Sequence, residues 1–283
     1  MTAAPLTPPP PGEREMQALA AAWPDRITQS ALRDGDWMVL LGDEWFAWAN
    51  GRMLPEGDRG DWEKYAPMNF YRYPLELPPL APLDETEAAA LRSRVKREQL
   101  DPPQRNEQFL GALLHAQDRQ STVARMVYMQ IAGFSVTVHE SIRDHLLHVS
   151  SELAILRGSD AEVAAYLRGL REMDGFNYRF VEGTRTRSLH SYGLAIDMIP
   201  KSYGGKHAYW QWAMSRVSDW WTIPYSQRWM PPLAFVKAFE REGFVWGGKW
   251  LFFDTMHFEY RPEILMLAAE DEPPVSSTGP QGR

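Results

Sequence analysis

The sequence predicts an α+β fold, in which a small antiparallel sheet is flanked by helices and preceded by an aromatic-rich N-terminal region. Segments with helical periodicity are interspersed with short apolar runs of strand length, and the turns between these runs permit antiparallel pairing. The length of 283 residues suffices for one large domain or two smaller ones. Hydrophobic residues make up 44% and charged residues 24%, which is ordinary for a globular protein.

The N-terminal quarter divides into a leader and an aromatic-rich region. Residues 1–13 contain four consecutive prolines and almost nothing to bury, which predicts a disordered, polyproline-like leader. Residues 14–75 form the aromatic-rich region. After a short helical segment, two apolar runs separated by Gly42 and Asp43 predict a hairpin. The sequence leaves open whether this region covers the following domain or binds a polymer.

The rest of the chain predicts a linker, a main domain and a tail. Residues 76–125 are expected to form a proline-rich linker followed by helices, residues 126–264 the main domain, and the polar residues 265–283 a disordered tail. The patterns predict, in order, helices over 85–100 and 105–115, strands over 126–131 and 134–138, helices over 141–156 and 159–173, strands over 176–181 and 194–199, a helix from 231 to 242 and a last strand containing His257.

Composition excludes several classes of function. The net charge of −7 argues against a nucleic-acid partner and against electrostatic docking on an anionic membrane. No run of about eighteen apolar residues occurs, so no transmembrane segment is expected, and the N-terminus shows no secretory signal pattern. There are no cysteines, hence neither disulfides nor thiolate metal ligands. Serine-hydrolase, P-loop and dinucleotide-binding motifs are absent.

Two histidines and an aspartate form a candidate zinc site. His190, Asp197 and His257 offer nitrogen and oxygen donors suited to zinc, and a catalytic zinc site takes three protein ligands and leaves the fourth position to water. In one extended strand, residues seven apart would lie roughly 23 Å from each other. The chain must therefore turn between His190 and Asp197, and Gly193 is placed for that turn. The alternative is a trio that is merely buried and hydrogen-bonded.

Asp254 precedes the last of these residues by three positions. In a regular strand Asp254 and His257 would face opposite sides of the sheet. Asp254 is therefore expected in a loop or bulge before the strand.

These residues stand in motifs that resemble a known family. The pattern S-x-H-x-x-G-x-A-x-D from Ser188 to Asp197 and the pattern D-x-x-H-F-E from Asp254 resemble the zinc D-alanyl-D-alanine carboxypeptidases. The stretch GFVWGGKW over 243–250 is similar to the lead-in of the subgroup that contains L-alanyl-D-glutamate endopeptidases and phage endolysins. The resemblance covers roughly residues 130–261.

The resemblance implies a zinc peptidase that hydrolyses peptidoglycan stem-peptide bonds involving D-amino acids. It implies one Zn²⁺ held by His190, Asp197 and His257, with Asp254 as the catalytic proton acceptor. It places the substrate carboxylate on Arg179, and Ser188 beside substrate. Alternatives are an orienting role for Asp254, a surface salt bridge for Arg179 and a loop contact for Ser188.

Several expectations remain open from the sequence. Both D,D-carboxypeptidase and L,D- or D,D-endopeptidase activity fit the resemblance, and the alternative is a catalytically inactive zinc-bearing cell-wall binding module. The substrate implies the cell envelope or periplasm, although no signal peptide is visible. Two further arginines near the motif, Arg185 and Arg187, are expected to face solvent, and the alternative is that they extend the basic pocket.

Overall fold

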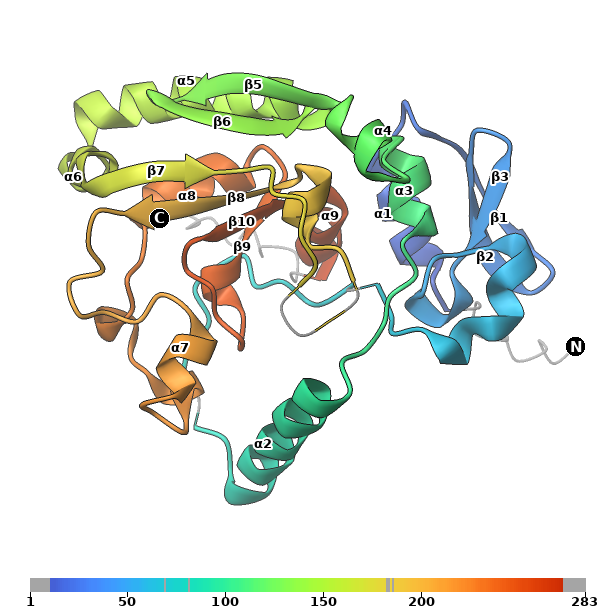
Figure 1. The fold of residues 1–283 in the computed structure, drawn as a ribbon, viewed down its shortest axis with the longest axis horizontal. Coiled ribbons are helices and arrows are strands. Elements are labelled where there is room, and N and C mark those ends of the chain that lie inside the picture. Colours follow the sequence, from blue (N-terminus) through green and yellow to red (C-terminus); the bar gives the residue numbers. More distant parts are fainter. Residues whose placement is uncertain (1–10, 69, 81, 182–183, 185, 272–283) are drawn as a thin grey trace, which may run out of the picture.

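Two four-stranded antiparallel sheets and one hairpin organise the fold (Figure 1). A computed structural model describes residues 11–68, 70–80, 82–181, 184 and 186–271, so most of the predicted leader and the end of the predicted tail lie outside the described residues. The N-terminal sheet has the order β1-β2-β3-β4 and the central sheet the order β7-β8-β10-β9, while β5 pairs with β6. The predicted α+β class with small antiparallel sheets is confirmed.

The strands are short. Their bounds are β1 (Ile27–Arg33), β2 (Asp36–Leu41), β3 (Glu44–Ala47), β4 (Leu54–Pro55), β5 (Met126–Ile131), β6 (Phe134–His139), β7 (Leu170–Asp174), β8 (Ala195–Pro200), β9 (Phe244–Trp246) and β10 (His257–Tyr260). The predicted hairpin about Gly42 is the β2–β3 pair, and β5 and β6 pair across Gly133 as expected.

The helices surround these sheets. Their bounds are α1 (Glu13–Ala22), α2 (Glu85–Leu100), α3 (Gln108–Leu114), α4 (Arg119–Val123), α5 (Arg143–Ser159), α6 (Ala161–Gly169), α7 (Trp210–Met214), α8 (Leu233–Glu240) and α9 (Pro262–Asp271). None of those in the described ranges is both long and apolar enough to cross a bilayer.

One hydrophobic core joins the N-terminal sheet to the central sheet. Met16 and Leu19 of α1 and Phe46 of β3 belong to the same buried cluster as Phe239 of α8 and Phe258 of β10. α1 packs on both α9 and β1, so it lies at the junction of the two parts (Figure 1). The aromatic-rich region therefore packs on the central domain.

The described residues between Lys64 and Glu85, called the strap below, connect the N-terminal sheet region to α2. Within the strap, the hydroxyl of Tyr73 accepts a hydrogen bond from the backbone N–H of Trp246 at 3.0 Å, and the Nζ of Lys249 donates to the carbonyl oxygen of Leu75 at 2.6 Å. α2 then forms a second, smaller core with the tryptophan-rich segment between β8 and α8, and Leu91 and Trp221 both belong to this buried cluster. This segment and the strap flank the central sheet.

Two of the predicted elements are wrong. The helix expected over 159–173 ends at Gly169, and residues 170–174 form β7 because they pair with β8, a distant partner that local periodicity does not reveal. Residues 176–181 make no strand and have an isolated bridge from Phe180 to Arg187. A Cβ on Gly175 would lie 2.3 Å from the carbonyl oxygen of Thr137, so the chain makes a close backbone approach there.

The predicted disordered tail also begins too early. Residues 265–271 belong to α9, whose first residue is Pro262, a favoured position for proline because its missing N–H is unpaired there in any helix. Ile264 and Ala268, four residues apart, are buried on one helix face. The polar sequence beyond them obscures this short apolar face.

Candidate metal centre

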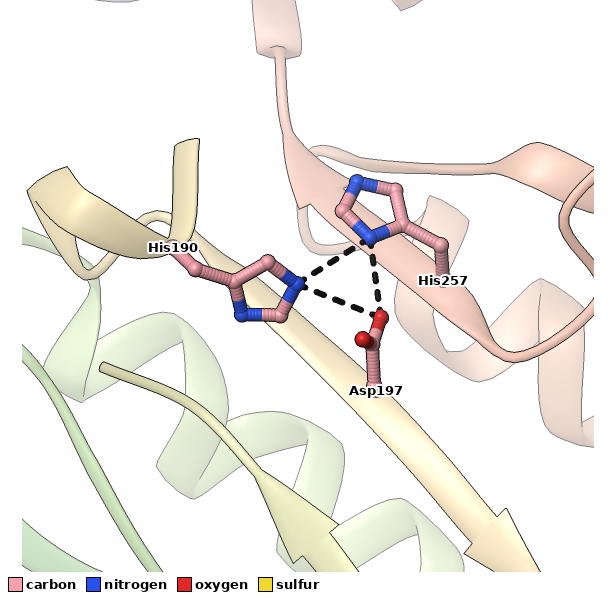
Figure 2. A group of neighbouring side chains, drawn as sticks. All are labelled: His190, Asp197 and His257. Carbon is pink, nitrogen blue, oxygen red and sulfur yellow. Dashed lines mark hydrogen bonds and ion pairs between the residues drawn. The ribbon is translucent and has the colours of Figure 1, made fainter. Parts of the chain in front are cut away.

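Two adjacent strands and one short helix bring His190, Asp197 and His257 together (Figure 2). β8 and β10 are antiparallel neighbours, and His257 lies directly opposite Asp197 in their register. Residues that face each other in this way point to the same side of a sheet. His190 lies on a 3₁₀ turn, Leu189–Tyr192, that precedes β8.

The turn predicted at Gly193 is confirmed. Gly193 has φ +67°, the left-handed region that glycine enters without steric cost. A Cβ at this position would lie 2.6 Å from the backbone nitrogen of His139. Two requirements, backbone angle and close approach, thus both select glycine between the first two candidate ligands.

The three donor atoms converge with spacings suited to a tetrahedral ion. His190 Nε2 lies 3.2 Å from Asp197 Oδ1 and 3.3 Å from His257 Nδ1, and His257 Nδ1 lies 2.9 Å from Asp197 Oδ1. Ligands held at about 2.0–2.1 Å from a tetrahedral zinc are separated by roughly 3.3 Å. The residues present therefore fit a small tetrahedral cation with little rearrangement.

Hydrogen bonds behind the histidines fix which nitrogen faces the centre. Nδ1 of His190 donates to the carbonyl oxygen of Gly175 at 2.7 Å, and Nε2 of His257 donates to Glu259 Oε2 at 3.1 Å. These partners imply tautomers that leave His190 Nε2 and His257 Nδ1 free to coordinate. Such carboxylate and carbonyl partners are typical of metal-ligating histidines.

The electrostatics of the ligand set favour positive charge. Burial disfavours the ionised forms, but hydrogen bonds from His190 and His257 outweigh it and hold the pKa of Asp197 well below its usual range. Burial also opposes charge on His257, yet its bonds to Asp197 and Glu259 raise its pKa well above the ordinary value. A proton on His257 thus offsets the negative charges of Asp197 and Glu259. A bound cation would replace that proton as the compensating positive charge.

Asp254 lies in the segment before β10, as the sequence predicts. Its backbone N–H donates to the carbonyl oxygen of Gly247 at 3.0 Å, and its Oδ1 accepts from the N–H of Met256 at 3.2 Å. Burial, together with repulsion from Asp197, raises the pKa of Asp254 to about 6. A Cβ on Gly247 would lie 2.5 Å from the Asp254 carbonyl oxygen, which gives the WGG stretch a physical reason.

Arg179 and Ser188 occupy different environments beside the centre. Both line a cavity of about 350 Å³ that also includes His190, Asp197 and Asp254. Arg179 is exposed, and its side chain makes no hydrogen bond or ion pair with the described part of the chain. Ser188 is buried, and its Oγ accepts a hydrogen bond from the His190 N–H at 3.3 Å.

Arg187 does not face solvent as predicted. It is buried, donates from Nε to Glu107 Oε2 at 2.9 Å and from Nη2 to the carbonyl oxygen of Ala116 at 3.0 Å, and stacks on Tyr192. The partners come from residues 70 or more positions upstream, which explains why the local sequence gave no sign of them. Arg185 lies outside the described residues.

Sequence reasoning missed two groups that support the ligands. Glu259 stands two positions after His257, so alternation along a strand would have placed both on one face. The carbonyl oxygen of Gly175 leaves no side-chain signal and could be found only from the fold.

Comparison with known proteins locates two matches. Residues 182–260 match the family described as D-alanyl-D-alanine carboxypeptidase, and residues 15–70 match a domain of unknown function. The first match contains His190, Asp197, Asp254 and His257, and it supports the resemblance to that family. No curated protein and no solved structure matches the chain.

Proposed function

We propose that the protein is a zinc-dependent peptidase that hydrolyses peptidoglycan stem-peptide bonds involving D-amino acids. The observation that carries the proposal is the convergence of His190, Asp197 and His257 on one point, inside the segment that matches a D-alanyl-D-alanine carboxypeptidase family. Asp254 lines the same cavity. One Zn²⁺ would be held by His190 Nε2, Asp197 Oδ1 and His257 Nδ1.

The chemistry divides between the ion and the side chains. When bound, a zinc ion supplies Lewis acidity to the scissile carbonyl and to a water molecule. Asp254 accepts a proton from the attacking water and delivers it to the leaving amine. Its raised pKa suits both steps, because a base is most effective when its pKa lies near the working pH.

Residues at the rim of the cavity would bind the substrate. The guanidinium of Arg179 would hold a substrate carboxylate through two parallel hydrogen bonds. Ser188 supports the histidine turn and stands beside the substrate. Activity on peptidoglycan would place the protein in the cell envelope.

The proposal is tested by digesting purified muropeptides with the full-length protein, with and without a chelator, and by identifying the products by mass. Loss of one alanine indicates a carboxypeptidase, and release of a longer fragment indicates an endopeptidase. Either product must disappear with chelator and return with added Zn²⁺. Binding of muropeptides without any cleavage by zinc-loaded protein would instead favour an inactive wall-binding module and contradict the proposal.

A further inference from the structure

The cavity at the metal centre contains more arginine than the proposed reaction uses. Among the described residues, four arginines line it: Arg105, Arg179, Arg187 and Arg261. An arginine remains charged even when buried, and an unpaired cation in a partly desolvated place is costly. Arg105, Arg187 and Arg261 are buried or half-buried, so each of them needs an anionic partner, either from the protein or from a ligand, whereas the exposed Arg179 is free to meet a ligand.

Two of the four have protein partners. Arg187 pairs with Glu107 at 2.9 Å. Arg261 donates from Nε to Glu263 Oε1 at 2.5 Å, and its Nη1 lies 3.6 Å from Glu259 Oε1. Both arginines are buried, and these carboxylates balance their charges within the fold.

Arg105 has no such partner. It lies in the segment before α3, where its backbone N–H donates to Thr186 Oγ1 at 3.2 Å. Its side chain is half-buried and makes no hydrogen bond or ion pair with any residue that the structure describes. Burial lowers its pKa, and the nearby Arg261 cation lowers it further, so the guanidinium is desolvated without being neutralised by a direct contact.

Arg105 and Arg179 line the same cavity but have different charged neighbours. The charge of Arg105 acts on Glu259, the carboxylate that holds His257. Arg179 instead acts on Asp174 of β7, and its carbonyl oxygen accepts a hydrogen bond from the N–H of Ser188 at 3.2 Å, beside the His190 turn. Two guanidinium groups without direct partners in the described residues thus line one cavity, and they belong to different segments of the chain.

We infer that Arg105 is a second carboxylate-binding residue, and that the site takes a peptide with two separate carboxylates, one on Arg179 and one on Arg105. The inference rests on the proposed function, which assigns a carboxylate to Arg179. Arg105 lies outside both matched segments, 15–70 and 182–260, so neither match accounts for it. A substrate with a single C-terminal carboxylate would leave one of the two guanidinium groups unpaired.

The test measures binding rather than turnover. Full-length Asp254→Asn protein in buffer with Zn²⁺ is titrated calorimetrically with a short stem-type peptide that has two carboxylates, and with its two monoamides. Each amidation is expected to weaken binding about 10- to 100-fold. Adding Arg105→Ala should weaken binding of the diacid by a similar factor and leave the affinity for one of the monoamides nearly unchanged, because that contact is already lost.

Two comparisons guard against a purely structural effect. Arg105→Lys keeps the charge but loses the planar fork, so it should recover part of the affinity for the diacid. Arg143→Ala removes an exposed arginine of α5 that pairs with Asp144 and should change nothing. Melting temperature and zinc content are measured for every variant.

Equal weakening of the diacid and both monoamides by Arg105→Ala, no weakening of any of them, or a loss of zinc in that variant would overturn the inference. The last result would mean that Arg105 acts through Glu259 and His257. Failure of the proposed function is a different result: wild-type protein would then cleave no muropeptide, whatever the binding data for Arg105 show.

Discussion

The proposed metal centre and the proposed substrate rim of this protein hold their side chains in opposite ways. Each histidine ligand is fixed from behind, His190 by the Gly175 carbonyl oxygen and His257 by Glu259, so the donor atoms already converge. At the rim, Arg105 and Arg179 have no direct side-chain partner in the described residues. The difference suggests that the centre is preorganised for its ion, whereas the rim groups are completed by substrate.

The largest expected effect is a loss of catalytic activity in a variant that still binds zinc. Replacing Asp254 by Asn removes the proton acceptor but keeps the shape, so kcat should fall by about 10²- to 10⁴-fold. The three ligand residues are untouched, and zinc content should remain that of the wild type. Single-turnover kinetics and elemental analysis measure the two quantities. Turnover at the wild-type rate would remove Asp254 from the mechanism.

Removing the charge of Glu259, which accepts a hydrogen bond from His257, should lower the zinc affinity without abolishing zinc binding. Glu259→Gln keeps a hydrogen-bond acceptor for His257 Nε2 but loses its charge, so zinc affinity should fall about 10- to 100-fold. Competition with a chromophoric chelator gives the affinity. Glu172→Gln, an exposed carboxylate on β7, is the matched control and should behave as wild type. An unchanged affinity in Glu259→Gln would show that the ligand geometry does not depend on this partner.

Substitutions of two arginines in the same loop should have different effects, one on substrate binding and the other on stability. Arg179→Ala should raise KM about 10-fold with little change in kcat or in the free energy of unfolding, because the exposed side chain makes no hydrogen bond or ion pair with the described residues and is proposed to bind substrate. Arg187→Ala should instead lower the free energy of unfolding by about 1–3 kcal/mol, because Glu107 loses its charged partner and the Ala116 carbonyl oxygen loses its donor. Kinetics and denaturant unfolding distinguish the pair. Equal destabilisation by both variants would contradict the assignment.

The smallest effect concerns the stability of the metal-free protein. Burial and Asp197 raise the pKa of Asp254 from 3.8 to about 6, so the folded state binds this proton more tightly than the unfolded chain does. The contribution of Asp254 to stability is therefore most favourable at low pH and declines as pH rises through this window. Asp254→Asn lacks the titration, so its melting temperature relative to wild type should rise by a few degrees over the same range. A constant difference would contradict the shift.

The sequence was most informative where one side chain or one turn decides the structure. The turn at Gly193 and the placement of Asp254 before β10 followed from glycine conformation and strand alternation, and both are observed. The predictions from sequence were wrong where residues distant in the sequence determine the local structure. β7 exists because β8 pairs with it, and Arg187 is buried because Glu107, the residue before α3, pairs with it from 80 positions upstream. Glu259 was visible in the motif, but its role depended on which ring nitrogen of His257 faces the centre.

The central claim is that His190, Asp197 and His257 form a metal centre, and zinc content tests it most directly. Wild-type protein and Asp197→Ala are exposed to Zn²⁺, dialysed and examined by elemental analysis. The wild type should retain one ion per chain, and the variant should retain none, because one of its three donors is gone. A wild-type protein that takes up no zinc, or an Asp197→Ala protein that keeps a full equivalent, would contradict the claim.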